Sequence, residues 1–181
     1  MSAGVLETLL ETLWSNADEQ VYWLVDGAQD PAISHRIRHG SLKFWSLYSG
    51  QLTPRLRAAA PYLVQLVPGH PQTLELLARG WGRAWGILLS VPVSLTMAKL
   101  RRHLKKHLQV RTEDGTLLMF RFYDPRVLSI YLPTCTQKEL AAFFGPIHRA
   151  FYELNNGSQW KCWKTAAFMI DARDTSPHAG W

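Results

Sequence analysis

Two histidine pairs are the residues whose types and spacing come closest to a metal site. The members of each pair are four residues apart, which would place two imidazoles on one face of a helix, as metal ligands require. The pairs are His35 with His39 and His103 with His107. Neither pair has a third candidate ligand nearby in the sequence, and the four cations of residues 101–107 would repel a metal from the second pair. A solvated helix face explains this second pair better, so we expect no metal site.

The cysteines and glycines give no catalytic set either. Cys135 and Cys162 form no metal-binding pattern, and Cys135 has no candidate base close to it in the sequence. The glycines of residues 80–86 lack the lysine of a phosphate-binding loop, and the sequence contains no serine-hydrolase or zinc-protease motif. We therefore expect that the protein is not an enzyme and uses no cofactor.

The charged residues are distributed unevenly along the chain. Residues 1–34 carry six acids and no lysine or arginine, whereas residues 35–111 carry thirteen lysines and arginines against one acid, Glu75. The densest basic segment, residues 99–111, could contact nucleic-acid phosphates, an acidic protein surface or only solvent. Nucleic acid is the least favoured of the three, because no recognisable nucleic-acid-binding motif accompanies the charge.

The eight tryptophans suggest protein contact instead. Some of them lie in or beside apolar runs and are expected in the core. Four others lie in polar or loop contexts, where an exposed aromatic ring can anchor a protein interface: Trp45, Trp160, Trp163 and Trp181. The first three of these are the candidate partner contacts.

The elements that would position these residues alternate along the chain. Apolar spacing predicts helices over residues 4–16 and 95–108, the second capped by Ser94. Asp-Pro pairs at residues 30–31 and 124–125, and the T-x-x-E capping box of Thr136, predict three further helix starts. Short apolar runs predict strands, with a D-G hairpin turn at residues 114–115: 21–25, 62–67, 85–91, 147–154 and 160–169. The pattern indicates an α/β (α+β) domain with a mixed β-sheet flanked by helices.

Length and composition bound the remaining possibilities. The chain has 181 residues, 47% of them hydrophobic, which suits one globular domain with a full core. Two cysteines make no disulfide framework, no apolar run reaches 18 residues, and the N-terminus has no basic segment of the kind that opens a secretion signal. We expect a cytoplasmic protein that is neither secreted nor inserted in a membrane.

One segment is recognisable. Residues 119–133 read MFRFYDPRVLSIYLP, and residues 143–146 read FFGP. Together they closely resemble the type VI secretion effector chaperone family, also called the adaptor family. Further blocks agree in the same order: LVDGA at 24–28, YSG at 48–50 with APYL at 60–63, and GWG at 80–82 with WGI at 85–87. The resemblance runs from about residue 21 to residue 152.

The resemblance implies a protein-binding role. Members of this family bind a toxic effector in the bacterial cytoplasm, often through an N-terminal segment of that effector. They help to load it onto the spike tip protein, the valine-glycine repeat protein. On this basis we expect an N-terminal amphipathic helix in residues 1–20, the adaptor domain in 21–154 and a short C-terminal strand and tail in 155–181.

The resemblance also directs attention to particular residues. Six residues of the matching blocks are expected to be structural: Asp26, Gly27, Asp124, Pro125, Gly145 and Pro146. Four more join the three tryptophans as candidate partner contacts: Tyr48, Arg121, Tyr123 and Arg126. Arg121 alternates with two phenylalanines along an expected strand and so should face away from them. Arg126, in the first turn of the next helix, should reach a carboxylate such as Asp26.

Overall fold

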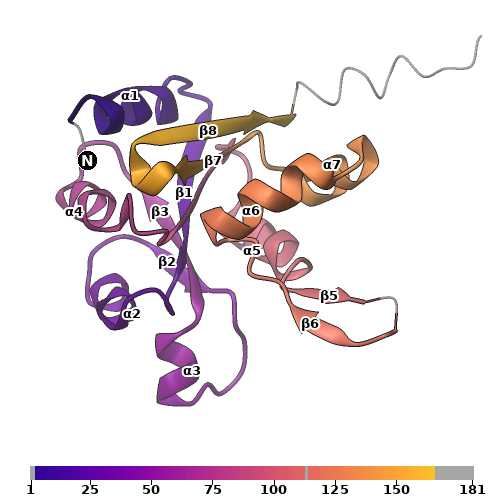
Figure 1. Cartoon of the computed structure of the whole chain (residues 1–181). Coiled ribbons are helices and arrows are strands. Elements are labelled where there is room, and N and C mark those ends of the chain that lie inside the picture. Colours follow the sequence, from indigo (N-terminus) through magenta and orange to yellow (C-terminus); the bar gives the residue numbers. More distant parts are fainter. Residues whose placement is uncertain (1–2, 113, 166–181) are drawn as a thin grey trace, which may run out of the picture.

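A six-stranded antiparallel sheet runs through the centre of the protein. The computed structural model describes residues 3–112 and 114–165. The strands are β1 (Glu19–Asp26), β2 (Phe44–Ser46), β3 (Pro61–Leu66), β4 (Gly86–Pro92), β7 (Arg149–Leu154) and β8 (Gln159–Lys164). They lie in the order β2-β3-β1-β4-β7-β8, so β2 and β8 form the two edges (Figure 1).

Each strand pair of the described sheet is antiparallel, where a mixed sheet was expected. The expected α+β class is confirmed. Two helical connections, from β1 to β2 and from β3 to β4, do join parallel strands, as the alternation of elements suggested. However, β3 and β4 are both antiparallel to β1, which lies between them. The parallel strands are therefore not neighbours, and the sheet contains antiparallel pairs only within the described residues.

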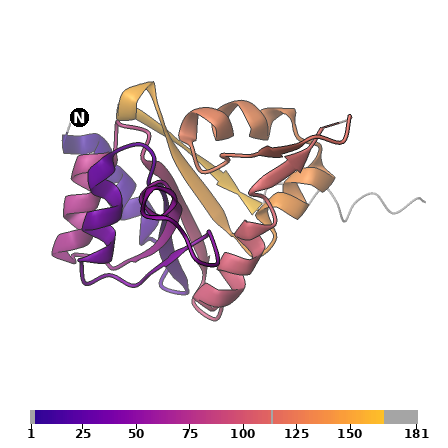
Figure 2. The ribbon, with the colours of Figure 1, turned by 90° about the horizontal axis from the view of Figure 1, so that it is seen from below.

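Helices cover both faces of this sheet (Figures 1 and 2). One face carries α1 (Ala3–Leu13), α2 (Pro31–Arg38) and α4 (Pro71–Gly80), and the other carries α5 (Met97–Lys105), α6 (Pro125–Tyr131) and α7 (Gln137–Phe144). The central strand β1 sends Val21, Trp23 and Val25 to the first face and Tyr22 and Leu24 to the second. Both sets are buried, which explains why this strand is a continuous apolar run rather than an alternating one.

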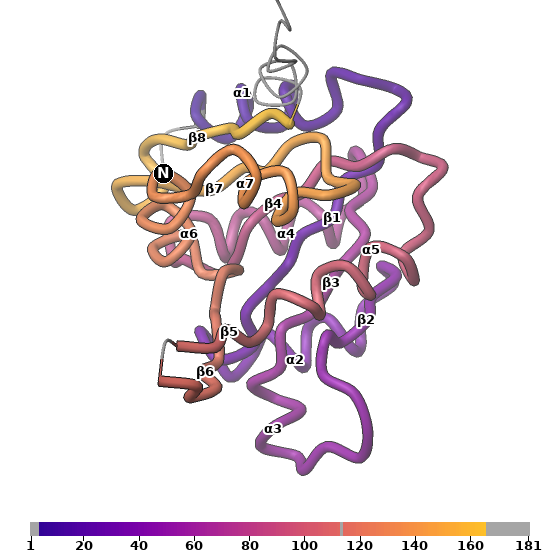
Figure 3. The backbone as a smooth tube through the Cα atoms, turned by 90° about the vertical axis from the view of Figure 1, so that its right-hand side faces the viewer, coloured from indigo at the N-terminus to yellow at the C-terminus, as the bar shows by residue number. Residues whose placement is uncertain are grey.

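The remaining elements are short. Helix α3 (Pro54–Ala58) precedes β3, and 3-10 turns lie at η1 (Leu132–Thr134) and η2 (Asn155–Gly157). Strands β5 (Gln109–Arg111) and β6 (Leu117–Met119) form a separate two-stranded hairpin that stands away from the main sheet (Figure 3). No helix in the described ranges is long and apolar enough to cross a membrane.

The helix starts follow the local sequence, with one correction. Asp30 and Asp124 cap α2 and α6 ahead of their prolines, and Thr136 with Glu139 forms the expected capping box of α7. Helix α5, however, is capped by Thr96 and not by Ser94. The Leu95 N–H donates to the Pro92 carbonyl at 2.9 Å, so residues 92–95 form a turn that delays the helix.

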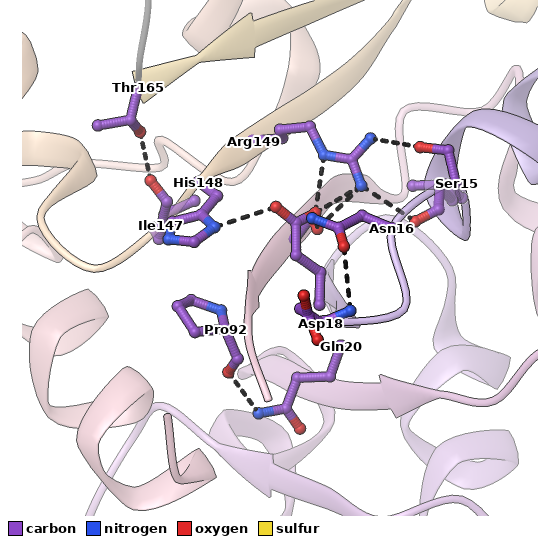
Figure 4. Close-up of polar contacts among 12 residues, drawn as sticks. Ser15, Asn16, Asp18, Gln20, Pro92, Ile147, His148, Arg149 and Thr165 are labelled. Atoms are coloured by element: carbon purple, nitrogen blue, oxygen red, sulfur yellow. Dashed lines mark hydrogen bonds and ion pairs between the residues drawn. The ribbon is translucent and has the colours of Figure 1, made fainter. Parts of the chain in front are cut away.

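A buried ion pair connects the start of β1 to the second half of the chain (Figure 4). The Arg149 guanidinium donates to Glu19 at 2.5 Å and to the Thr12 carbonyl, near the end of α1, at 2.8 Å. Ser90 and His148 also hydrogen-bond the Glu19 carboxylate. Burial alone would raise the pKa of Glu19, but these hydrogen bonds and the Arg149 charge outweigh it and lower the pKa. Arg149 therefore ties α1, β1 and β7 together.

His107 is enclosed by rings on the other face of the sheet. Its imidazole lies 5.1 Å from the Phe143 ring and 6.1 Å from the Phe122 ring, centre to centre. Its Nε2 is buried and has no hydrogen-bond partner in the described structure. Burial, with the nearby His103 and Lys106, lowers the pKa of His107 to about 4.

The Arg149 anchor gives the first prediction. Arg149→Ala leaves Glu19 buried without its guanidinium, so we expect the free energy of unfolding to fall by about 3 kcal/mol in urea denaturation. Arg36→Ala is the control, because Arg36 pairs with Glu75 on the surface and such a pair contributes about 1 kcal/mol or less. Equal losses in the two variants would contradict the anchoring role.

The pKa of His107 gives a second prediction. The unfolded chain protonates this histidine near its ordinary value of 6.5, whereas the folded protein does so at about 4. Stability should therefore fall as the pH drops from 6.5 to 4, by up to about 3 kcal/mol. In His107→Leu the melting temperature should depend less on pH over this range, whereas in the exposed-site control His35→Leu it should follow the wild type. An unchanged pH profile in His107→Leu would refute the assignment.

Candidate partner-binding surface

Two of the blocks that carry the family resemblance, 24–28 and 119–133, meet in one polar cluster. Asp26 ends β1. About a hundred residues further along the chain, Arg121 lies in the turn before α6, Asp124 caps that helix and Arg126 lies in its first turn. Gln29 joins them from the turn after β1. It donates to Asp26 at 3.0 Å and to Asp124 at 3.4 Å, and its side-chain oxygen accepts from Arg126 at 3.3 Å. We call these five residues the signature cluster.

The two arginines of the cluster exchange the roles that the sequence suggested. Arg121 forms the ion pair with Asp26, and Arg126 instead binds Asp124 through two nitrogens at 2.6 and 2.9 Å. The expected strand ends at Met119, and residues 121–124 form a turn closed by the Asp124 N–H and the Arg121 carbonyl at 2.9 Å. The strand alternation therefore does not extend to Arg121, and the turn directs its side chain to Asp26.

The carboxylates of the cluster are buried while its arginines reach solvent. The Asp26 and Asp124 side chains are 1% and 5% exposed, against 45% for Arg121 and 65% for Arg126. Burial alone would raise the pKa of Asp124, but hydrogen bonds from Arg126 and the charges of both arginines lower it. The buried carboxylates of the cluster thus stabilise the fold, and its two arginines, held by these carboxylates, face solvent.

Two glycines and two prolines of the matching blocks have structural roles. A Cβ at Gly27 would collide with the carbonyl oxygens of Ala58 and Ala60, and the Gly27 N–H donates to the Ala60 carbonyl at 3.1 Å. Gly145 ends α7 with φ of 50°, a conformation that favours glycine, and Pro146 follows it. Pro125 fills the first turn of α6.

Trp45 and Tyr48 lie together at the β2 edge. Trp45 is 43% exposed, and the Arg101 guanidinium lies 5.9 Å from the centre of its ring. Arg101 also donates to the Ser46 carbonyl at 2.6 Å and to the Tyr48 carbonyl at 3.2 Å. These residues line a shallow pocket of about 390 Å³. Arg101, which the sequence did not single out, thus holds the aromatic edge in place.

Tyr123 does not reach this surface. Its side chain is 2% exposed and belongs to the core beneath α6. Burial raises the pKa of Tyr123, and a hydrogen bond with Tyr48 adds to the effect. Tyr123 is therefore a core residue that hydrogen-bonds Tyr48, and we do not retain it as a partner contact.

Trp160 and Trp163 lie at the opposite edge of the sheet, on β8. Trp160 packs toward Phe151 on the face covered by α1, α2 and α4. Trp163 lies on the other face, where its Nε1–H donates to the Tyr152 hydroxyl at 3.1 Å. Both rings are half-buried. The exposed and half-buried aromatic candidates therefore form two groups, one at each edge of the sheet.

A pocket of about 650 Å³ beside the signature cluster was not foreseen from the sequence. Arg126 and Ile130 line it from α6, and Ile130 is 73% exposed. On the far wall, the Ala84 N–H donates to the buried Glu153 carboxylate at 2.5 Å, and the Gly82 N–H does so too. Ala84 has φ of 54°, so Glu153 holds a turn that a non-glycine residue rarely adopts. Burial raises the pKa of Glu153 despite these hydrogen bonds.

Within residues 3–112 and 114–165, the histidines and cysteines do not assemble into a metal site. Among the residues described, no group of three or more histidines, cysteines, aspartates or glutamates could hold a metal ion. The His103 Nε2 forms a hydrogen bond with the Phe143 carbonyl oxygen at 2.8 Å. The rings of His35 and His39 stack with their centres 4.1 Å apart. Cys135 and Cys162 are free thiols whose pKa is raised, chiefly by burial.

The described residues form an α+β domain that presents ion-paired arginines and edge aromatic residues at its surface. A family model described as a domain of unknown function (DUF4123) matches residues 21–142, and the chain belongs to this family. Searches of curated proteins and of solved structures gave no match. The matched segment includes the whole signature cluster and the β2 edge, whereas β7 and β8 follow it.

The division of the signature cluster into scaffold and surface can be tested. Arg121→Ala removes the cation paired with the buried Asp26, so we expect the free energy of unfolding to fall by roughly 2 kcal/mol. Arg126→Ala should cost under about 1 kcal/mol, because Arg126 is exposed and Asp124 keeps its backbone hydrogen bond and the Arg121 charge. Urea denaturation measures both, and a larger loss in Arg126→Ala would reverse the assignment.

Proposed function

We propose that this protein is an effector adaptor of type VI secretion. It binds a toxic effector in the bacterial cytoplasm, through an N-terminal segment of that effector, and helps to load it onto the spike tip protein. It performs no catalysis and is not itself secreted. The observation that supports this proposal is the match to DUF4123, a family known for type VI effector adaptors, over residues 21–142.

The arrangement of the surface suits a protein with two partners. The β2 edge offers Trp45 and Tyr48 beside Arg101, and the signature cluster offers Arg121 and Arg126. Tryptophan, tyrosine and arginine dominate the binding energy of protein interfaces. The β8 edge offers a second pair of aromatic residues, separated from the first by four strands. An adaptor that must hold cargo and spike at the same time needs two such separate surfaces.

The basic helix α5 favours protein over nucleic acid as its partner. Two of its cations are already used within the protein. Arg101 binds backbone carbonyls near β2, and the Lys105 ammonium donates to the Ser49 hydroxyl at 2.6 Å. Because these two side chains are held against the protein, fewer cations can reach phosphates directly than the sequence suggested. Nucleic-acid affinity depends on the number of phosphates that are neutralised.

Co-expression with the products of the two flanking genes tests the proposal. We expect a stoichiometric complex with a toxin-like neighbour that survives moderate salt during size exclusion, together with a better yield of that neighbour. Purification of the protein alone, with both neighbours present in good yield, would refute the adaptor role. Binding to random DNA that weakens steeply with salt would instead favour nucleic acid.

Single substitutions then locate the contacts within that complex. Trp45→Ala and Trp163→Ala should each weaken binding of one partner at least tenfold, because an interface tryptophan commonly contributes more than about 1.4 kcal/mol. Leu74→Ala is the matched control: Leu74 on α4 is 42% exposed, like Trp45, but belongs to neither edge strand. If all three variants bind equally, the edges are not the contact surfaces. Titration calorimetry with each purified partner measures the affinities.

A further inference from the structure

The β5–β6 hairpin carries exposed apolar side chains on both of its faces. Val110 and Leu118 lie opposite each other on one face, while Leu117 and Met119 share the other face. All four are between 40% and 53% exposed. A two-stranded hairpin buries little apolar surface and is at best marginally stable in water. An exposed apolar strand edge of this kind is a template for pairing with another chain.

The outer edge of β6 is open for such pairing. The Thr112 N–H donates to the Thr116 carbonyl at 2.9 Å, and the Phe120 N–H donates to the Leu108 carbonyl at 2.9 Å. In an antiparallel pair these bonds fall on alternate residues, so Leu117 and Met119 direct their N–H and C=O groups away from β5. Leu117 and Met119 thus supply both the outward backbone groups and two of the exposed apolar side chains.

The surroundings of this edge are positively charged. Residues 99–111 contain six lysines and arginines and no acid. None of the six takes part in an ion pair within the described residues. Lys99, Arg102 and Lys106 are exposed around α5, and Arg111 lies directly opposite Leu117 in the hairpin register. An occupant of the apolar face would therefore meet a cation beside it.

We propose that β6 is a strand-addition site for an extended polypeptide segment with alternating apolar residues and a net negative charge. The backbone of that segment pairs with Leu117 and Met119, its apolar side chains pack on theirs, and its acids meet Arg111 and the α5 cations. The proposal goes beyond the adaptor role and does not depend on it, because the chemistry of the segment is fixed whichever protein supplies it.

A random twelve-residue peptide library displayed on phage, selected against the full chain, is the probe. Enriched peptides should be acidic and should alternate apolar with polar residues. We expect their affinity to fall at least tenfold for the Leu117→Asp, Met119→Asp double variant and to stay unchanged for Leu74→Asp, since Leu74 is also exposed but lies on α4. Leu117→Pro removes one outward N–H that β5 does not use, so it should also weaken binding at least tenfold while circular dichroism shows a native melting curve.

Other results would overturn the proposal. Selection that yields no acidic alternating peptides, or peptides that bind the double variant as well as the wild type, excludes strand addition at β6. Binding of anionic vesicles that requires Leu117 and Met119, without peptide enrichment, would assign the hairpin to a membrane surface. A dimer in sedimentation equilibrium that dissociates in the double variant would assign it to a second copy of the chain.

Discussion

Two carboxylates at the ends of one buried strand determine much of this structure. Strand β1 lies in the middle of the sheet with both faces covered, yet it begins at Glu19 and ends at Asp26, and both side chains are buried. A buried carboxylate is tolerated when a cation and hydrogen bonds compensate for its lost hydration. Arg149 supplies the cation at one end and Arg121 at the other. Each arginine comes from the second half of the chain. The two ion pairs that compensate the carboxylates of β1 therefore also fix the N-terminal helix, through Arg149, and the turn before α6, through Arg121.

This requirement separates the inner from the outer surface of the signature cluster. Asp26 and Asp124 keep the arginines in fixed positions, and the arginines in turn present their remaining donors to solvent. Arg101 does the same for the β2 edge, where it binds two carbonyls and lies against Trp45. Fixed cations and rings lose little conformational entropy when a partner binds, which favours recognition by preorganisation. The surface is therefore built as a by-product of the interactions that stabilise the fold.

The sequence predicted the parts of the structure that depend on neighbouring residues. The caps of Asp30, Asp124 and Thr136 and the buried β1 run are local patterns, and the structure confirms them. The choice between Arg121 and Arg126 as partner of Asp26 was wrong because it depends on a turn at residues 121–124 that ends the strand early. The burial of Tyr123, the pocket beside Ile130 and the role of Arg101 depend on segments that are distant in sequence. Strand alternation could have shown that Trp160 and Trp163 face opposite sides of the sheet, since they are three residues apart.

The width of the sheet has a mechanical consequence. Neighbouring strands lie about 4.8 Å apart, so five spacings separate the two edges by about 24 Å. A tension applied between partners held at β2 and β8 would act across the strands, along the direction of their hydrogen bonds. Loaded in that direction, a sheet opens like a zipper, one bond after another, and not by the cooperative shear that makes sheets strong along their strands. The β2–β3 and β4–β7 ladders, with three paired residues each, are the shortest in this series and would yield first.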